Sequence, residues 1–366
     1  MMQSPSQLIR IAPRWRLSAD FASRIRPAHL IALLPLLLAA MLAPVARAQS
    51  TIDRVHRDNG VDSGKILKAT PLGVTVSKGS VETVVPSEEI QFVSFGDEPA
   101  ELAAVRRAMQ TQRYDQVLEA LAKVELPADA REELAAEVAY YGAEAQARQA
   151  VAGQGDAAHA VVAVRDFLAK HRASFHVPAM LESLGDLLAA QGKHADARVE
   201  YNKLSLAKND YYALRAQWLA GRCWQAQGEH DKALAEFDKA SAAAIHGSRA
   251  EQLKTSLTLD AAVSRAAQGK GDQSVQDIAA LIAKAAPDDV DLLARAYNAL
   301  GECYLAGGDK QGALFAFLHV DLLYRQSSQQ HAQALRQLIP LWKAAGREDR
   351  SQAAAATLAE KYPRSR

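Results

Sequence analysis

The spacing of hydrophobic positions changes near Pro99. From there to the C-terminus apolar residues recur three and four positions apart, as in Leu102, Val105 and Met109, and Ala, Leu, Glu, Gln, Lys and Arg dominate. Such spacing places apolar side chains on one face of a helix. The sequence therefore predicts a helical region over residues 99–366.

Residues 49–98 instead carry short β-rich runs separated by turn signals such as Asp58-Asn59-Gly60. The five runs are 51–56, 65–68, 74–77, 81–85 and 90–95. They predict a small all-β module, an antiparallel meander of SH3-like or Sm-like type. About fifty residues is marginal for independent stability, so we expect this β module to pack against the helices that follow.

The first 48 residues have the pattern of a secretory signal peptide. Five arginines precede an uncharged apolar run of thirteen residues, Leu30 to Leu42, and Ala46-Arg47-Ala48 has the small-x-small form of a cleavage site. We predict cleavage after Ala48 and an exported chain, periplasmic or extracellular. A retained membrane anchor is the alternative, although spanning a bilayer needs about 20 apolar residues and this run contains Pro35.

Charge argues against two classes of partner. The chain has 43 Lys and Arg against 42 Asp and Glu, and loss of residues 1–48 leaves an acidic excess of roughly four charges. Such a chain lacks the basic surface of a general nucleic-acid or anionic-lipid binder. An Sm-like module would suggest RNA binding, but the aromatic residues that stack bases are few, and we favour a capping or docking role for it.

A five-position pattern recurs three times in the helical region. A Gly is followed by a bulky residue three positions later, a Gly after seven, an Ala after twelve and an aromatic after sixteen. The copies are Gly185-Leu188-Gly192-Ala197-Tyr201, Gly221-Trp224-Gly228-Ala233-Phe237 and Gly301-Tyr304-Gly308-Ala313-Phe317. The first Gly permits close helix packing, the second suits a turn, and the aromatic is expected to fill the gap between neighbouring repeats.

This pattern resembles the tetratricopeptide repeat (TPR) family, whose unit is a 34-residue helix–turn–helix. The resemblance covers about residues 98–366 and implies an α-solenoid of six or seven stacked helical hairpins. Weaker copies include one with Ala262 in place of the first Gly, whose turn glycine is Gly269 or Gly271, and one with Ile339 and Gly346. The repeats are longer than 34 residues, so the superhelical pitch of the family cannot be assumed.

The resemblance also implies a binding site, because TPR ligands usually lie in a concave groove lined by the first helices. The matching positions are Arg215, Trp218, Arg222 and Gln225 in one repeat, Arg295, Asn298 and Glu302 in another, and Ala179, Glu182, Asp186 and Ala189 in a third. Arginine beside tryptophan can hold a carboxylate and stack an apolar side chain, which favours a peptide ligand. The Lys and Asn clamp with which some members grip acidic C-termini is not reproduced.

No motif for catalysis, cofactor or metal binding is found. The histidines lack metal-ligand spacing and are expected at the solvated surface, and Glu133 and Glu137 are expected on a solvated helix face. Cys223 and Cys303 take equivalent repeat positions with one repeat between them, hence roughly 20 Å apart, too far for a disulfide. We predict two buried, unpaired thiols.

The sequence thus predicts an exported, non-enzymatic scaffold for protein–protein interactions, with a role in cell-envelope assembly; self-association is compatible with it. Two alternatives remain open. One is a cell-wall or glycan binder that uses the β module as its contact surface. The other is an enzyme with its site at the junction of the β module and the helices.

Overall fold

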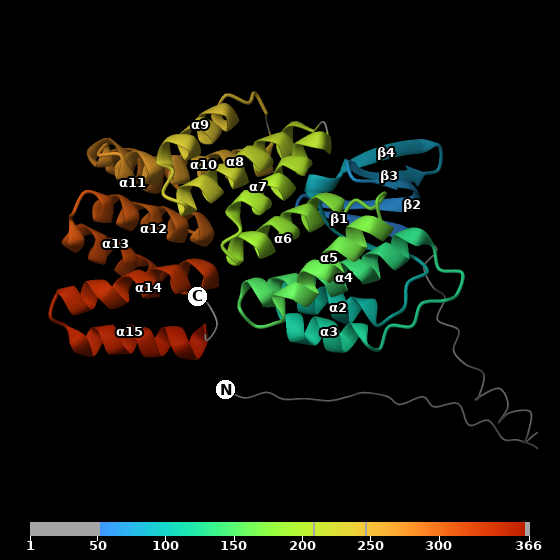
Figure 1. Ribbon diagram of the computed structural model, residues 1–366. Coiled ribbons are helices and arrows are strands. Elements are labelled where there is room, and N and C mark those ends of the chain that lie inside the picture. Colours follow the sequence, from blue (N-terminus) through green and yellow to red (C-terminus); the bar gives the residue numbers. More distant parts are fainter. Residues whose placement is uncertain (1–51, 208, 246, 363–366) are drawn as a thin grey trace, which may run out of the picture. The chain divides into compact units, whose positions relative to one another are not determined.

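The computed structural model describes residues 52–362 apart from residues 208 and 246. The predicted signal peptide lies outside these described residues. Most of the described chain is helical, and a five-stranded antiparallel sheet precedes the helices, as the sequence predicts (Figure 1).

The sheet is a meander with its last strand added beside the first. Its order is β4-β3-β2-β1-β5. The strands are β1 (Asp53–Arg57), β2 (Gly60–Thr70), β3 (Gly73–Lys78), β4 (Val81–Pro86) and β5 (Ile90–Ser94), with a one-turn 3-10 helix, η2 (Ser87–Glu89), before β5. The long strand β2 pairs with β1 through residues 60–64 and with β3 through residues 65–70, so it joins the two halves of the sheet.

The sheet and the first helices share one hydrophobic core. Val55, Val74 and Val93 of the sheet belong to the same buried cluster as Leu102 and Leu134 of the helical region. The β module therefore packs against the helices that follow it, as its small size leads us to expect.

Seven helical hairpins follow the sheet in the described residues. They are α2 (Leu102–Gln110) with α3 (Tyr114–Leu121), α4 (Glu132–Val151) with α5 (Ala157–Lys170), α6 (Val177–Ala190) with α7 (His194–Asn202), α8 (Asp210–Ala226) with α9 (His230–Ser241), α10 (Ser248–Ala267) with α11 (Gly271–Lys284), α12 (Val290–Ala306) with α13 (Lys310–Leu323), and α14 (Ser328–Ala344) with α15 (Glu348–Lys361). A short 3-10 helix, η3 (Lys203–Ala207), follows α7. The second helix of each of the first six pairs also packs on the first helix of the next pair, which stacks the hairpins in chain order (Figure 1).

Glycines in a left-handed conformation end the first helices of six hairpins. Their φ angles lie between 71° and 85°, at Gly153, Gly192, Gly228, Gly269, Gly308 and Gly346. The turn of the fifth hairpin is therefore made by Gly269, and Gly271 begins α11. The first hairpin has Gln112, with a φ of 56°, at the corresponding place.

The recurring aromatic residue lies directly on the first glycine of its own hairpin. A Cβ atom added at Gly221 would lie 2.3 Å from the Phe237 ring, and one at Gly185 would lie 2.2 Å from the Tyr201 ring. The sequence prediction placed these aromatic rings between neighbouring repeats and did not include this contact. The glycine is thus needed because no side chain fits beneath the ring.

Cys223 and Cys303 are free and buried, as predicted. Burial raises the pKa of the Cys223 thiol and raises that of Cys303 to about 12. Because the thiolate is the reactive form, we expect both thiols to react far more slowly with a disulfide reagent at pH 8 than a free thiol does. A disulfide reagent that releases a chromophore when it reacts with a thiol gives the reaction rate, which is compared between the native and the urea-unfolded chain. Rapid reaction of either thiol in the native chain would contradict it.

Within the part of the chain that the structure describes, no helix is both long enough and apolar enough to cross a lipid bilayer.

Candidate functional site

A groove runs along the first helices of five hairpins, α6 to α14. Two adjoining cavities, of about 640 and 450 Å³, make up most of it, and both are bordered by Trp218 and Arg295. The smaller cavity is lined by residues of α8, α10, α12 and α14, with His230 the only contribution from a second helix. The larger cavity extends from α8 and α10 to α6 and the β module. The stacking of the hairpins thus aligns the first helices into one continuous surface.

Trp218 lies at the centre of this groove between three guanidinium groups. The guanidinium carbons of Arg215, Arg222 and Arg295 lie 5.1, 5.0 and 5.2 Å from the centre of a ring of its indole. These distances are typical of cation–π contacts, which hold arginine side chains against an aromatic face. We call these four residues the arginine–tryptophan cluster.

Two carboxylates balance the three guanidinium groups of the cluster. Glu182 of α6 accepts hydrogen bonds from two nitrogens of Arg215, one of them, Nε, at 2.6 Å. Asp260 of α10 accepts from Trp218 Nε1 at 2.8 Å and from Arg295 Nη2 at 2.9 Å. Burial alone would raise the pKa of Glu182, but the charge and hydrogen bonds of Arg215 lower it. Burial lowers the pKa of Arg295, although the charge of Asp260 and the hydrogen bond to it oppose this shift.

Arg222 is the least satisfied cation of the cluster. Its side chain is 48% exposed, and its ion pair with Asp260 is 3.8 Å long. At that length the pair contributes little, because hydrogen-bonded pairs lie closer than about 3.2 Å. The cluster therefore offers one guanidinium to an anionic group in the groove.

Carboxamide groups line the smaller cavity beside the cluster. Asn298 is 99% buried and donates both amide hydrogens to Gln330, which leaves its Oδ1 atom without a partner in the described residues. Gln225 donates hydrogen bonds to two groups of α10, the main-chain oxygen of Asp260 and the hydroxyl group of Ser264. Glu302 accepts from Gln337, and burial raises its pKa. Gln329, Gln330 and Gln333 of α14 also line this cavity, and carboxamide groups suit the alternating donors and acceptors of a peptide main chain.

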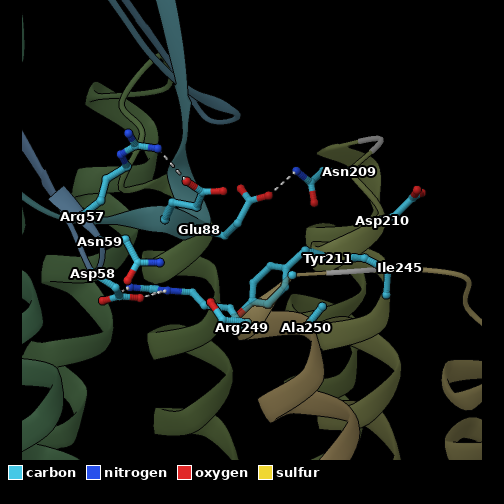
Figure 2. A pocket seen from close by; sticks show the side chains of 13 residues that line it. Arg57, Asp58, Asn59, Glu88, Asn209, Asp210, Tyr211, Ile245, Arg249 and Ala250 are labelled. Atoms are coloured by element: carbon cyan, nitrogen blue, oxygen red, sulfur yellow. Dashed lines mark hydrogen bonds and ion pairs between the residues drawn. The ribbon is translucent and has the colours of Figure 1, made fainter. Parts of the chain in front are cut away.

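The β module forms the other end of the groove. Figure 2 shows a third cavity, of about 480 Å³, between the β1–β2 turn, η2 and the N-terminal ends of α8 and α10. Asp58 accepts hydrogen bonds from Arg249, the shorter being 3.0 Å, and Glu88 accepts from Asn209 at 3.0 Å (Figure 2). The Ser87 and Tyr212 hydroxyl groups lie 2.9 Å apart. The sheet is thus joined to helices more than one hundred residues away in the chain.

The structure brings the sequence-predicted site residues together. Six of the seven, Trp218, Arg222, Gln225, Arg295, Asn298 and Glu302, line the smaller cavity, and Arg215 lines the larger one. The sequence analysis missed Asp260, because the hairpin of α10 matches the repeat pattern poorly and was given no groove positions. A single acid in the run Leu257 to Val263, whose other residues apart from Thr258 are apolar, is a signal that could have identified it.

Several polar side chains that the sequence places in solvent are buried instead. Glu137 is fully buried and contacts His176 Nε2 at 2.7 Å, and His176 stacks on Tyr140. His331 is fully buried between Asp321 and Tyr362. The surface predictions for these residues are therefore wrong. Glu137 lies three and four positions from the buried Leu134 and Tyr141, so the helical period itself places it on the inner face.

Over the residues that the structure describes, no group of three or more His, Cys, Asp or Glu side chains is arranged to hold a metal ion.

The chain is similar to solved TPR structures. A tetratricopeptide repeat protein from Parabacteroides merdae is 18% identical, with a TM-score of 0.47, over 71% of this chain and 91% of that chain. The apo form of RapI is 10% identical, with a TM-score of 0.43, over 71% and 75% of the two chains. The TPR domain of P58(IPK) is 15% identical, with a TM-score of 0.24, over 71% and 74%. No protein-family model and no curated protein matches the chain.

Proposed function

We propose that the chain is an exported, non-enzymatic scaffold that binds a protein partner through the groove, with a role in cell-envelope assembly. The observation that carries the proposal is the half-exposed guanidinium of Arg222, which lies against Trp218 and has only a long ion pair. An extended segment of the partner would place a carboxylate on Arg222 and its main chain along the amide groups of the smaller cavity. Export is supported by the sequence of residues 1–48 alone.

The β module gives less support to the glycan-binding alternative. Sugar rings commonly stack on exposed aromatic faces, whereas the exposed large apolar side chains of the sheet region are aliphatic: Ile52, Val61, Leu67, Leu72, Val81 and Val84. Phe95 is buried, and Phe92 is stacked on His56. The β module serves better as a cap on the first hairpin and as an end wall of the groove.

Site-specific crosslinking tests where the partner binds. A photoreactive amino acid at Ser256, which lines the larger cavity, is expected to crosslink a protein in the compartment where the chain resides. The same group at Val199, which is 58% exposed on α7, is the control for general surface contacts. Equal crosslinking of the same proteins from both positions would argue against the groove.

Substitution of Arg222 tests the proposed anchor. We expect Arg222→Gln to weaken binding of the crosslinked segment, as a synthetic peptide, by about tenfold or more, because a charge-assisted hydrogen bond contributes about 1.5–3 kcal/mol. Arg350→Gln is the matched control, because Arg350 is 62% exposed, has an ion pair of 3.9 Å and lies on α15. Titration calorimetry measures both. An unchanged affinity for Arg222→Gln would contradict the proposed anchor.

A further inference from the structure

The Asp260 carboxylate lies where the carboxylate of a ligand would lie. Its Oδ2 atom receives the indole N–H of Trp218 and a guanidinium N–H of Arg295, and it is 3.8 Å from Nε of Arg222. The proposed function assigns the anionic group of the partner to one of these three side chains, Arg222. The groove thus carries an anion of its own at the binding point.

Asp260 is the shared counter-ion of two arginines, whereas Arg215 has its own. Glu182 engages Arg215 through both carboxylate oxygens. Arg222 and Arg295 have only Asp260 as a carboxylate partner within the ion pairs of the described chain. Replacing the Asp260 carboxylate by another would leave the pairing of Arg215 and Glu182 intact.

The Asp260 side chain can move without moving its helix. The main-chain oxygen of Asp260 accepts a hydrogen bond of 2.9 Å from Gln225, which ties α10 to α8 independently of the carboxylate. The neighbouring residues Leu257, Leu259 and Ala262 are buried and fix the helix further. The side chain is 17% exposed and borders the smaller cavity, so a change of its rotamer needs no change in the backbone.

We propose that Asp260 is a built-in competitor, whose carboxylate is hydrogen-bonded to Arg295 and lies beside Arg222 in the empty groove and is displaced by a carboxylate of the ligand. The inference rests on the proposed function. A ligand that offers a carboxylate alone exchanges one anion for another and gains little. A segment that also forms hydrogen bonds with the polar side chains that line the smaller cavity binds well. Asp260 thereby determines specificity for extended acidic segments over simple anions.

The test compares Asp260→Asn with the unmodified chain. An N-acetylated, fluorescein-labelled hexapeptide of alternating Glu and Leu is the probe, and fluorescence anisotropy gives its affinity. We expect Asp260→Asn to bind the probe about tenfold more tightly, because Arg222 and Arg295 lose their competing anion, while the amide oxygen of the new side chain still accepts from Trp218. Asp277→Asn, which removes the same charge from the exposed face of α11, is expected to bind as the unmodified chain does.

The outcomes separate this inference from the proposed function. If the unmodified chain binds the probe and Asp260→Asn binds it equally or more weakly, Asp260 only positions Trp218 and Arg295, and the inference is overturned while the proposed function stands. If neither chain binds the probe, both are contradicted. Asp260→Ser also lacks the carboxylate that pairs with the arginines, so it is expected to show the same gain in affinity for the probe. This second variant is used if Asp260→Asn has a lowered melting temperature.

Discussion

Replacement of Asp53 by Ala is expected to lower the free energy of unfolding by about 3–5 kcal/mol, the range for breaking one side of a buried ion pair. Asp53 is 3% exposed and accepts hydrogen bonds from Arg131 and from the main-chain N–H groups of Ile66 and Gly96, each at 2.9 Å. It therefore joins β1 to β2, to the end of β5 and to the residue before α4. Ala would leave two main-chain donors without their acceptor, and the Arg131 guanidinium would keep only Asp97 as a carboxylate partner.

Urea unfolding of the full chain, followed by circular dichroism, measures this loss. Asp349→Ala is the control, because its ion pair with Arg347 is 2.8 Å long but largely exposed, and we expect no measurable change from it. A midpoint for Asp53→Ala equal to that of the unmodified chain would show that the β module is not held by this residue.

The contribution of Asp53 also depends on pH with a defined sign. Burial alone would raise the pKa of Asp53, but the hydrogen bonds from Arg131, Gly96 and Ile66 together with the Arg131 charge lower it below its ordinary value. A carboxylate with a lowered pKa in the folded state stabilises fully above its unfolded pKa, near 3.9, and progressively less as the pH falls through the folded value. The difference in the free energy of unfolding between Asp53→Asn and the unmodified chain is therefore expected to shrink below about pH 4.

Local sequence signals were sufficient to predict where most helices, strands and turns lie. Asn59-Gly60 and the glycines Gly192, Gly228 and Gly308 mark turns through their own backbone preferences, and the period of apolar residues marks the helices. These signals act within a few residues. The resemblance to TPR proteins, rather than these signals, implied six or seven hairpins and most of the groove residues, and the described chain has seven hairpins.

The contacts that complete the site join distant residues, and the sequence did not predict them. Asp58 and Arg249 are 191 residues apart, and Glu88 and Asn209 are 121 apart. The pairing of Asp260 with Trp218 and Arg295 depends on how three successive hairpins stack. Which charged side chains meet depends on the stacking geometry, and the lengthened repeats left that geometry undefined.

Gly221→Ala is expected to destabilise the chain by about 1–3 kcal/mol, although Ala is the better helix former. The new Cβ atom would lie 2.3 Å from Cε1 of Phe237, well inside van der Waals contact. Phe237 is fully buried in the main hydrophobic cluster, so its ring has no free space to enter. Either the ring leaves its rotamer or α8 and α9 separate, and both reduce packing over the whole hairpin.

Gly142→Ala provides the matched control within α4. The nearest atom to its added Cβ is Leu121 Cδ1 at 3.7 Å, an ordinary contact, so Ala is expected to leave stability unchanged or raise it by up to about 1 kcal/mol through helix propensity. The urea midpoint of Gly221→Ala should therefore fall below that of the unmodified chain, whereas the midpoint of Gly142→Ala should stay equal to it or rise. Equal stability of Gly221→Ala and the unmodified chain would refute close packing of the ring on the glycine.

A second substitution tests whether the ring itself causes the loss. In Gly221→Ala, the further change Phe237→Leu removes the ring atoms that meet the new Cβ atom. Phe237→Leu should therefore lower the free energy of unfolding less in the Gly221→Ala background than in the unmodified chain. Phe237→Leu alone leaves space above Gly221 and is expected to destabilise by itself. A double-mutant cycle isolates the coupling, which we expect to exceed about 0.5 kcal/mol because the two residues are in contact. Additive effects would place the cause of the Gly221→Ala loss elsewhere in the helix.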